Sequence, residues 1–147
     1  MDVPAEIISF IPHRPPFLWV DRIISCSEDT IVTEKTFSED LDIYQGHYPN
    51  NPITPGVLLC EAVFQSGAVL MAKIHPPPAN EQSKVPVLTR INGAKFKRGV
   101  YPGDTVRIKV QLKEKVASVF FLKGVLKSCG KTALQVDFAC AMADRPA

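Results

Sequence analysis

Few features of this sequence point to a metal site, a disulfide framework or a nucleic-acid partner. The chain of 147 residues has four cysteines, none in a CxxC pair, and no histidine lies at a zinc-like spacing from them. The net charge is only +2, which is too small to suggest nucleic acid as the partner. We therefore expect free, buried thiols in a reducing compartment and no bound metal. The cysteines are Cys26, Cys60, Cys129 and Cys140.

The chain also has little that would direct it to or through a membrane. Residues 1–6 carry no basic region and no long apolar run, so we expect no signal peptide. The longest nearly apolar stretch, 57–72, is interrupted by Glu61, Gln65 and Ser66 and is too short and too polar for a membrane span. We expect one cytoplasmic domain over residues 1–147, without a membrane partner.

One long apolar helix is predicted from Pro55-Gly56 to about Lys73. Proline suits the first helical turn, where its missing N–H is not needed. Apolar residues lie nearly all the way round this helix, so it should be buried rather than lie on a surface. A proline run at 76–78 ends the helix, and residues 44–56 before it form a rigid, proline-rich loop.

Alternating apolar and polar residues predict strands in most of the remaining chain. The predicted strands cover residues 17–26, 30–37, 86–91, 105–113, 118–127 and a last run that includes 134–142, with a short helix near 7–10 and a polar loop at 79–84. Five or six mostly antiparallel strands are thus available to cover one buried helix. The predicted class is α+β, with a curved sheet wrapped around a central helix.

Glu61 is the only charged residue between Gly56 and Lys73. Desolvation in apolar surroundings disfavours a carboxylate, so we expect Glu61 to keep its proton near neutral pH and to be able to act as a general acid. The alternative is a glutamate that points to solvent or pairs with an arginine. Gln65 lies one helical turn further on the same face, where it either orients Glu61 or simply satisfies the core.

His47 and Gly56 are further candidates, near the start and at the end of the proline-rich loop. Histidine accepts a proton near neutral pH, and a rigid loop would hold it in place. Gly56 begins the helix, where unpaired N–H groups and the helix dipole favour negative charge, so its amide can hold a thioester oxygen. Taken alone, His47 is also explained as a structural histidine and Gly56 as a requirement of backbone geometry.

Two groups of basic residues remain. His13 and Arg14 lie between prolines and can bind substrate, although we favour a structural role for them. A second group lies near a predicted turn and either faces solvent or docks an acidic partner. This basic cluster consists of Lys95, Lys97 and Arg98.

Three blocks of this sequence resemble one enzyme family. Residues 46–62 resemble the signature GHFPxxPxxPGVLxxEA of the 3-hydroxyacyl-acyl-carrier-protein dehydratases of type II fatty acid synthesis, including the spacing from His47 to Glu61. Residues 11–22 and 95–104 match two further blocks of the family in the same order. The resemblance therefore spans nearly the whole chain.

The resemblance implies a hotdog fold and a homodimer whose sheets join edge to edge, often assembled further as a trimer of dimers. It places each active site between two chains and implies an acyl carrier protein, with a 4'-phosphopantetheine-linked acyl substrate, as the partner. No cofactor is implied. By the same resemblance, His47 is the base and Glu61 of the partner chain is the acid. The Gly56 amide would donate a hydrogen bond to the thioester carbonyl, and the Ile53 carbonyl would orient the His47 ring. Gln65 would support the acid.

The sequence departs from the family pattern at four places. Tyr48 replaces a phenylalanine, residues 50–51 replace a frequent Gly-Lys, Thr54 often has a larger apolar counterpart, and Gly99 stands where proline is common. These changes leave the chemistry intact.

Two other functions fit the same residues. In an acyl thioesterase of this fold, Glu61 would activate water and the product would be a free acid. In a non-catalytic acyl-carrier-binding subunit of a specialised lipid or polyketide synthase, the basic cluster alone would carry the function. We favour dehydration, because an acid and a base on either side of one substrate suit elimination.

Overall fold

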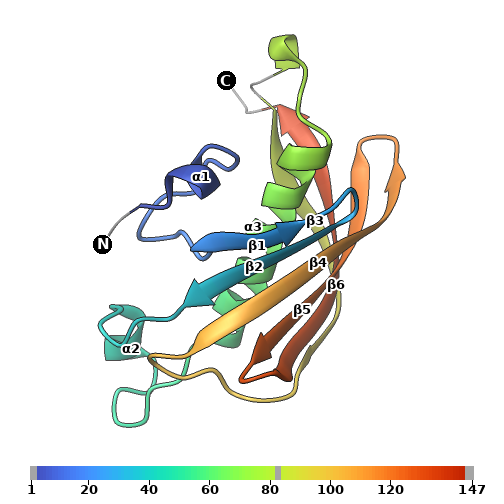
Figure 1. Ribbon diagram of the computed structural model, residues 1–147. Coiled ribbons are helices and arrows are strands. Elements are labelled where there is room, and N and C mark those ends of the chain that lie inside the picture. The colour runs from blue at the N-terminus through green and yellow to red at the C-terminus, as the bar shows by residue number, and fades with distance from the viewer. Residues whose placement is uncertain (1–2, 82–83, 145–147) are drawn as a thin grey trace.

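A six-stranded antiparallel sheet curves around one long helix in the computed structural model, which describes residues 3–81 and 84–144 (Figure 1). The order across the sheet is β1-β2-β4-β5-β6-β3, so β1 and β3 are the edge strands. The strands are β1 (Arg22–Cys26), β2 (Thr30–Thr36), β3 (Lys84–Phe96), β4 (Thr105–Val116), β5 (Val119–Ser128) and β6 (Lys131–Asp144). The predicted class and the wrapped arrangement are confirmed.

Helix α3 (Gly56–Ile74) is the long helix inside the curve of the sheet (Figure 1). From Leu59 to Met71 every residue except Glu61 is buried, as the apolar pattern predicts. A Cβ on Gly67 would lie 2.8 Å from the Phe138 ring, so the missing side chain lets helix and sheet approach closely. The stretch was predicted to be too short and too polar to span a membrane. That prediction was wrong, since the 19 residues of α3 are long and apolar enough to do so. However, 67% of its most apolar segment is buried inside the structure, as in the core helix of a folded domain.

The short helices and some strand boundaries differ from prediction. Helices α1 (Ala5–Ile8) and α2 (Ile43–Gly46) and the 3-10 helix η1 (Ala79–Glu81) are single turns. The strand predicted from residue 17 begins only at Arg22, because the Trp19 N–H donates to the Gln65 side chain instead of to a neighbouring strand. Strand β3 is longer at both ends than predicted. The predicted polar loop 79–84 lies partly outside the described residues, which omit 82–83.

The buried and exposed sides of the sheet follow the alternation in the sequence. In β4, Val106, Ile108 and Val110 are fully buried while the lysine and arginine between them are exposed. All four cysteines are free, but only Cys60 and Cys140 are buried. The expectation of buried thiols was therefore wrong for the other two, which lie in β1 and in the turn between β5 and β6.

Strand β3 presents an apolar edge. It pairs with β6 on one side, and no other described strand pairs with it. Exposed apolar side chains run along it: Val87, Leu88, Ile91 and Phe96. A long edge strand of this kind is a surface on which another strand can pair.

Candidate active site

His47 lies directly after α2, and the fold fixes its ring. The backbone N–H of His47 donates to the Ile43 carbonyl at 3.0 Å, and the ring Nδ1 lies 2.7 Å from the Ile53 carbonyl oxygen. A carbonyl oxygen only accepts hydrogen bonds, so Nδ1 carries the proton and Nε2 keeps its lone pair. The neutral ring therefore presents Nε2 as the basic nitrogen.

The loop that carries His47 is closed by a pair of buried hydroxyls. The Tyr44 hydroxyl and Thr54 Oγ1 lie 2.6 Å apart, and the Thr54 N–H donates to the Val100 carbonyl at 2.8 Å. Burial raises the pKa of the Tyr44 phenol. Tyr44 and Thr54 flank the segment from His47 to Ile53, so these bonds restrict both of its ends. The hydrogen bond between His47 and Ile53 is therefore held in a rigid loop.

Gly56 is the first residue of α3, where the backbone N–H groups have no partner inside the helix. A Cβ at this position would lie 2.8 Å from Cε1 of Phe96, the last residue of β3. The absence of a side chain thus lets the exposed Phe96 ring lie against Gly56. A ligand oxygen at the start of the helix would meet the positive end of the helix dipole.

Glu61 lies one and a half turns into α3 with its side chain 24% exposed. Its Oε1 accepts a hydrogen bond from Gln65 Nε2 at 3.1 Å. Gln65 is itself buried, donates from Nε2 to the Phe17 carbonyl at 3.0 Å and accepts the Trp19 N–H at 2.7 Å. Gln65 therefore joins Glu61 to the segment that precedes β1.

His13 is the contact of Glu61 that the sequence did not predict. Its Nε2 lies 3.7 Å from Glu61 Oε1, a close approach that is longer than a hydrogen bond. Burial lowers the pKa of His13, the Glu61 carboxylate raises it, and Arg14 lowers it again. The only signal in the sequence is that residues 11–22 belong to a block of the same family signature as Glu61.

His47 and Glu61 have separate hydrogen-bond partners within one chain. Among the described residues, no hydrogen bond or ion pair joins them: His47 is bonded to Ile53, and Glu61 contacts Gln65 and His13. We name the first group (His47, Ile53 and Gly56) the histidine half-site and the second group (Glu61, Gln65 and His13) the glutamate half-site.

The sequence matches the FabA-like domain family over residues 11–137, which covers all of both half-sites and most of the sheet. The chain belongs to the FabA-like family. It is 37% identical to the 3-hydroxyacyl-[acyl-carrier-protein] dehydratase FabZ of Anaeromyxobacter sp. (strain Fw109-5), over 99% of this chain and 92% of that protein. It is 41% identical to FabZ of Chloroflexus aggregans, over 92% of this chain and 88% of that protein.

Solved structures match the FabA-like chain in fold. The dehydratase heterocomplex ApeI:P from Xenorhabdus doucetiae aligns with a TM-score of 0.79 at 15% identity, over 99% of this chain and 94% of that one. The E. coli PaaI protein aligns with a TM-score of 0.61 at 18% identity, over 81% and 80% of the two chains. At these identities the likeness shows the hotdog fold alone.

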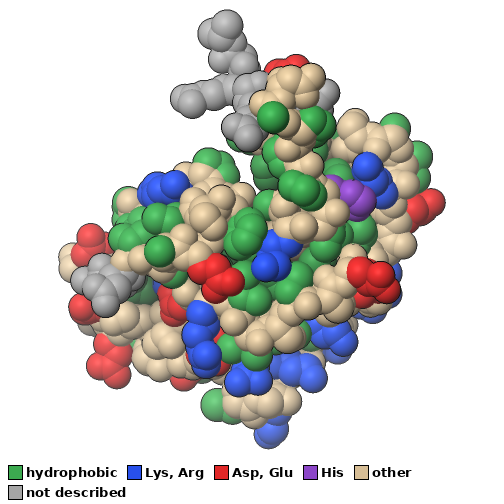
Figure 2. Space-filling view, turned by 45° about the horizontal axis from the view of Figure 1, so that its top comes forward, with side chains coloured by type: hydrophobic (Ala, Val, Ile, Leu, Met, Phe, Trp, Pro, Cys, Tyr) green, Lys and Arg blue, Asp and Glu red, His purple; other side chains and the backbone are tan. Residues whose placement is uncertain are grey.

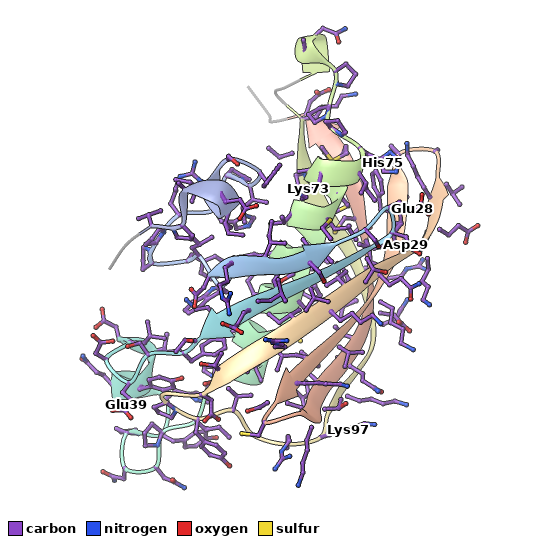
Figure 3. The ribbon with its side chains drawn as sticks, in the orientation of Figure 1. Glu28, Asp29, Glu39, Lys73, His75 and Lys97 are labelled. Atoms are coloured by element: carbon purple, nitrogen blue, oxygen red, sulfur yellow. The ribbon has the colours of Figure 1, made fainter. Side chains whose placement is uncertain are left out.

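The basic cluster of this FabA-like chain lies beside the histidine half-site. Lys95, Lys97 and Arg98 are exposed and flank Phe96, whose ring covers Gly56. Lys97 lies at the end of the sheet where α3 begins, away from Lys73 and His75 (Figure 3). Figure 2 shows that lysine and arginine side chains gather along the lower edge of the face in view. The predicted cluster is therefore accessible, whatever its role.

The buried thiols and the acidic residues add no second reactive centre. Burial is the main cause that raises the pKa of Cys60, and the nearby Glu61 charge raises it further. The same two causes raise the pKa of Cys140 to about 11. Both remain protonated near neutral pH and are poor nucleophiles. In residues 3–81 and 84–144, no group of three or more His, Cys, Asp or Glu is placed to hold a metal ion.

Proposed function

We propose that this chain removes water from 3-hydroxyacyl thioesters to give trans-2-enoyl thioesters, with the acyl group carried on acyl carrier protein in fatty acid biosynthesis. The observation that carries the proposal is the His47 ring, whose Nδ1 is committed to Ile53 so that Nε2 is free to take a proton. Membership of a family with FabZ relatives supports the same reaction. A cytoplasmic location remains a prediction.

In this mechanism His47 Nε2 takes a proton from C2 of the substrate. Negative charge then develops on the thioester oxygen, where the Gly56 amide donates to it. Glu61 of a second chain gives its proton to the 3-hydroxyl, and the C3–O bond breaks with release of water. One proton has moved to His47 and one has left Glu61, so the enzyme returns to its starting state when a proton passes from the imidazolium back to the carboxylate.

Both halves of the mechanism are needed for a useful rate. Proton transfer by one positioned side chain accelerates a reaction by roughly 10²–10⁴-fold. Loss of one oxyanion donor costs roughly 10²–10³-fold in kcat. Neither contribution alone approaches the acceleration of about 10⁶-fold at the lower end of the enzyme range.

The assay that tests the function follows enoyl absorbance with 3-hydroxyacyl and trans-2-enoyl carrier-protein thioesters. We expect turnover by the wild type and a loss of about 10²–10⁴-fold in kcat for His47→Ala. Lys127→Ala is the control, because Lys127 is exposed on β5 outside both half-sites and should leave kcat unchanged.

Other results would select another function. Equal activity of wild type and His47→Ala would contradict the assignment. Free carrier thiol without enoyl product would indicate a thioesterase, and tight carrier binding without turnover on any chain length would indicate a binding subunit.

Glu61 has no arginine partner among the described residues, and its contacts leave one carboxyl oxygen for substrate, as elimination requires.

The active unit is a homodimer in this proposal. Two observations support it: the half-sites are separate within one chain, and the exposed apolar edge of β3 needs a partner. Pairing of β3 with its copy would join the sheets of two chains, as the family resemblance implies. A trimer of such dimers remains a prediction from the resemblance alone.

A cavity beside the glutamate half-site is a candidate for the acyl chain. It measures about 320 Å³ and lies between the 8–14 segment and the far half of α3. Phe10, Ala68 and Met71 form apolar parts of its lining, and Arg14 and His75 are among the polar parts. The apolar parts can pack against an acyl chain.

The basic cluster is proposed as the docking site of the carrier protein. Reversing one charge, with Lys97→Glu or Arg98→Glu, should raise KM for carrier-bound substrate several-fold and leave KM for a small thioester analogue nearly unchanged. Steady-state kinetics on both substrates give the comparison. Lys109→Glu is the matched control, because Lys109 is exposed on β4 outside the cluster. Equal effects on the two substrates, or the same effect from the control, would remove the docking site.

A further inference from the structure

We infer that His13 is a positioning residue that fixes which oxygen of Glu61 carries the acidic proton. The inference rests on the proposed role of Glu61 as the general acid. A carboxyl group has two oxygens, and only a proton on the oxygen that faces the substrate can be given to the departing hydroxyl. Some feature of the site must therefore distinguish Oε1 from Oε2.

Both nitrogen groups near the carboxyl face the same oxygen. Gln65 Nε2 donates to Oε1 at 3.1 Å, and His13 Nε2 lies 3.7 Å from Oε1. Among the described residues, no hydrogen bond is made to Oε2. Oε1 accepts the Gln65 N–H and has the His13 nitrogen close by, beyond hydrogen-bond distance, so the proton belongs on Oε2.

The surroundings of His13 make its Nε2 the N–H donor. The Nδ1 atom is buried and has no hydrogen-bond partner. A proton on Nδ1 would be an unpaired buried N–H, whereas an unpaired lone pair there costs less, so the neutral ring carries its proton on Nε2. Burial also lowers the pKa of His13, which keeps the ring neutral. His13 thus offers Glu61 an N–H without a full positive charge.

The segment around His13 is tied to both sides of the glutamate half-site. The Arg14 guanidinium donates to the backbone carbonyls of Ile8, Ile11 and His13. Gln65 bonds the backbone of Phe17 and of Trp19, so the same side chain that holds Glu61 holds the His13 segment. The close approach of His13 and Glu61 is therefore set by α3 itself.

The arrangement serves both states of the acid. Before the reaction, Oε1 accepts the Gln65 N–H with His13 Nε2 close by, and Oε2 holds the proton for the substrate. After Glu61 has given its proton to the hydroxyl, the same N–H groups face a carboxylate, to which hydrogen bonds are roughly twice as strong. Contacts that are loose in the free enzyme commonly tighten in the substrate complex, which fits the 3.7 Å separation.

A substrate that needs no acid separates this role from a structural one. In a 3-chloroacyl thioester, His47 still takes the C2 proton, but the C3–Cl bond breaks to release chloride, which needs no proton. For His13→Leu we expect kcat about 10- to 100-fold lower on the 3-hydroxyacyl substrate, the value of one hydrogen bond to a charged group. KM and the rate on the 3-chloroacyl substrate should stay close to wild type, after subtraction of the uncatalysed elimination.

His13→Gln is the rescue variant, because its amide can place an N–H near the position of Nε2, and it should keep most of the hydroxyacyl activity. The ratio of the two substrates within one preparation is independent of the folded fraction, and His13→Phe replaces the leucine variant if that one does not fold. Equal losses on both substrates, a glutamine variant as poor as leucine, or an unchanged leucine variant would overturn the inference. Glu61→Gln tests the proposed function separately: full hydroxyacyl activity there would remove Glu61 as the acid, whatever His13 does.

Discussion

His47→Ala and Glu61→Gln chains, each nearly inactive alone, should regain roughly a quarter of wild-type activity when they are co-expressed in equal amounts. The reason is that, in the proposed dimer, each active site takes its histidine half-site from one chain and its glutamate half-site from the other. In a mixed dimer, the intact His47 of one chain faces the intact Glu61 of the other at one of the two sites. Random pairing makes half of the dimers mixed, and each has one working site.

A mixture of wild type with the double variant His47→Ala/Glu61→Gln gives the opposite control. Mixed dimers then have no complete site, so activity should fall to roughly a quarter of that of an all-wild-type sample instead of half. Turnover assays with light scattering to establish the dimer measure both mixtures. If each chain held a complete site, the first mixture would stay inactive and the second would keep half of the activity.

Gly56→Ala should lower kcat by up to about 10²-fold, with little change in stability. Alanine keeps the backbone N–H, but the added methyl group, 2.8 Å from Cε1 of Phe96, and the ring that it displaces would hinder the thioester oxygen from reaching that N–H. Phe96 is 53% exposed, so its ring can move aside and the fold tolerates the change. The loss should therefore appear in catalysis.

Gly67→Ala is the matched comparison in the same helix. A Cβ there also lies 2.8 Å from a phenylalanine ring atom, but Phe138 is only 2% exposed and cannot move out of the core. Overpacking costs about 1–3 kcal/mol, of which the helix preference of alanine returns up to about 1 kcal/mol. Thermal unfolding and kcat measured on both variants should show opposite patterns. A Gly56→Ala enzyme with normal kcat would contradict the proposed role of this amide.

The sequence predicts the main elements of the fold because burial leaves a periodic pattern. Helix α3 and strand β4 are examples: their apolar residues give a helical and a strand pattern, and these residues are the buried ones. The strand predicted from residue 17 failed because a side chain from α3, Gln65, takes the N–H of Trp19. The length of β3 was missed because an edge strand with exposed apolar residues has no alternation to detect.

The candidate site divides in the same way. The signature around His47 and Glu61 predicts which residues matter. The structure shows His47 Nδ1 at hydrogen-bond distance from the Ile53 carbonyl and a bond from Gln65 to Glu61, and the roles of these residues stay predictions. The approach of His13 to Glu61 could not be predicted, because it arises from the packing of the N-terminal segment against α3 rather than from any local pattern. In the proposed dimer a second chain completes the site, and one sequence describes that chain only through its resemblance to a family.

The separation of His47 from Glu61 along one chain has a consequence for gene duplication. In a dimer that shares its sites in this way, a duplicated copy that loses His47 still supplies Glu61 to a partner, and a copy that loses Glu61 still supplies His47. Each defective copy remains useful so long as it pairs with a complementary one. Selection can then retain two unequal subunits with one working centre between them, and the acyl-binding walls of the idle centre become free to change.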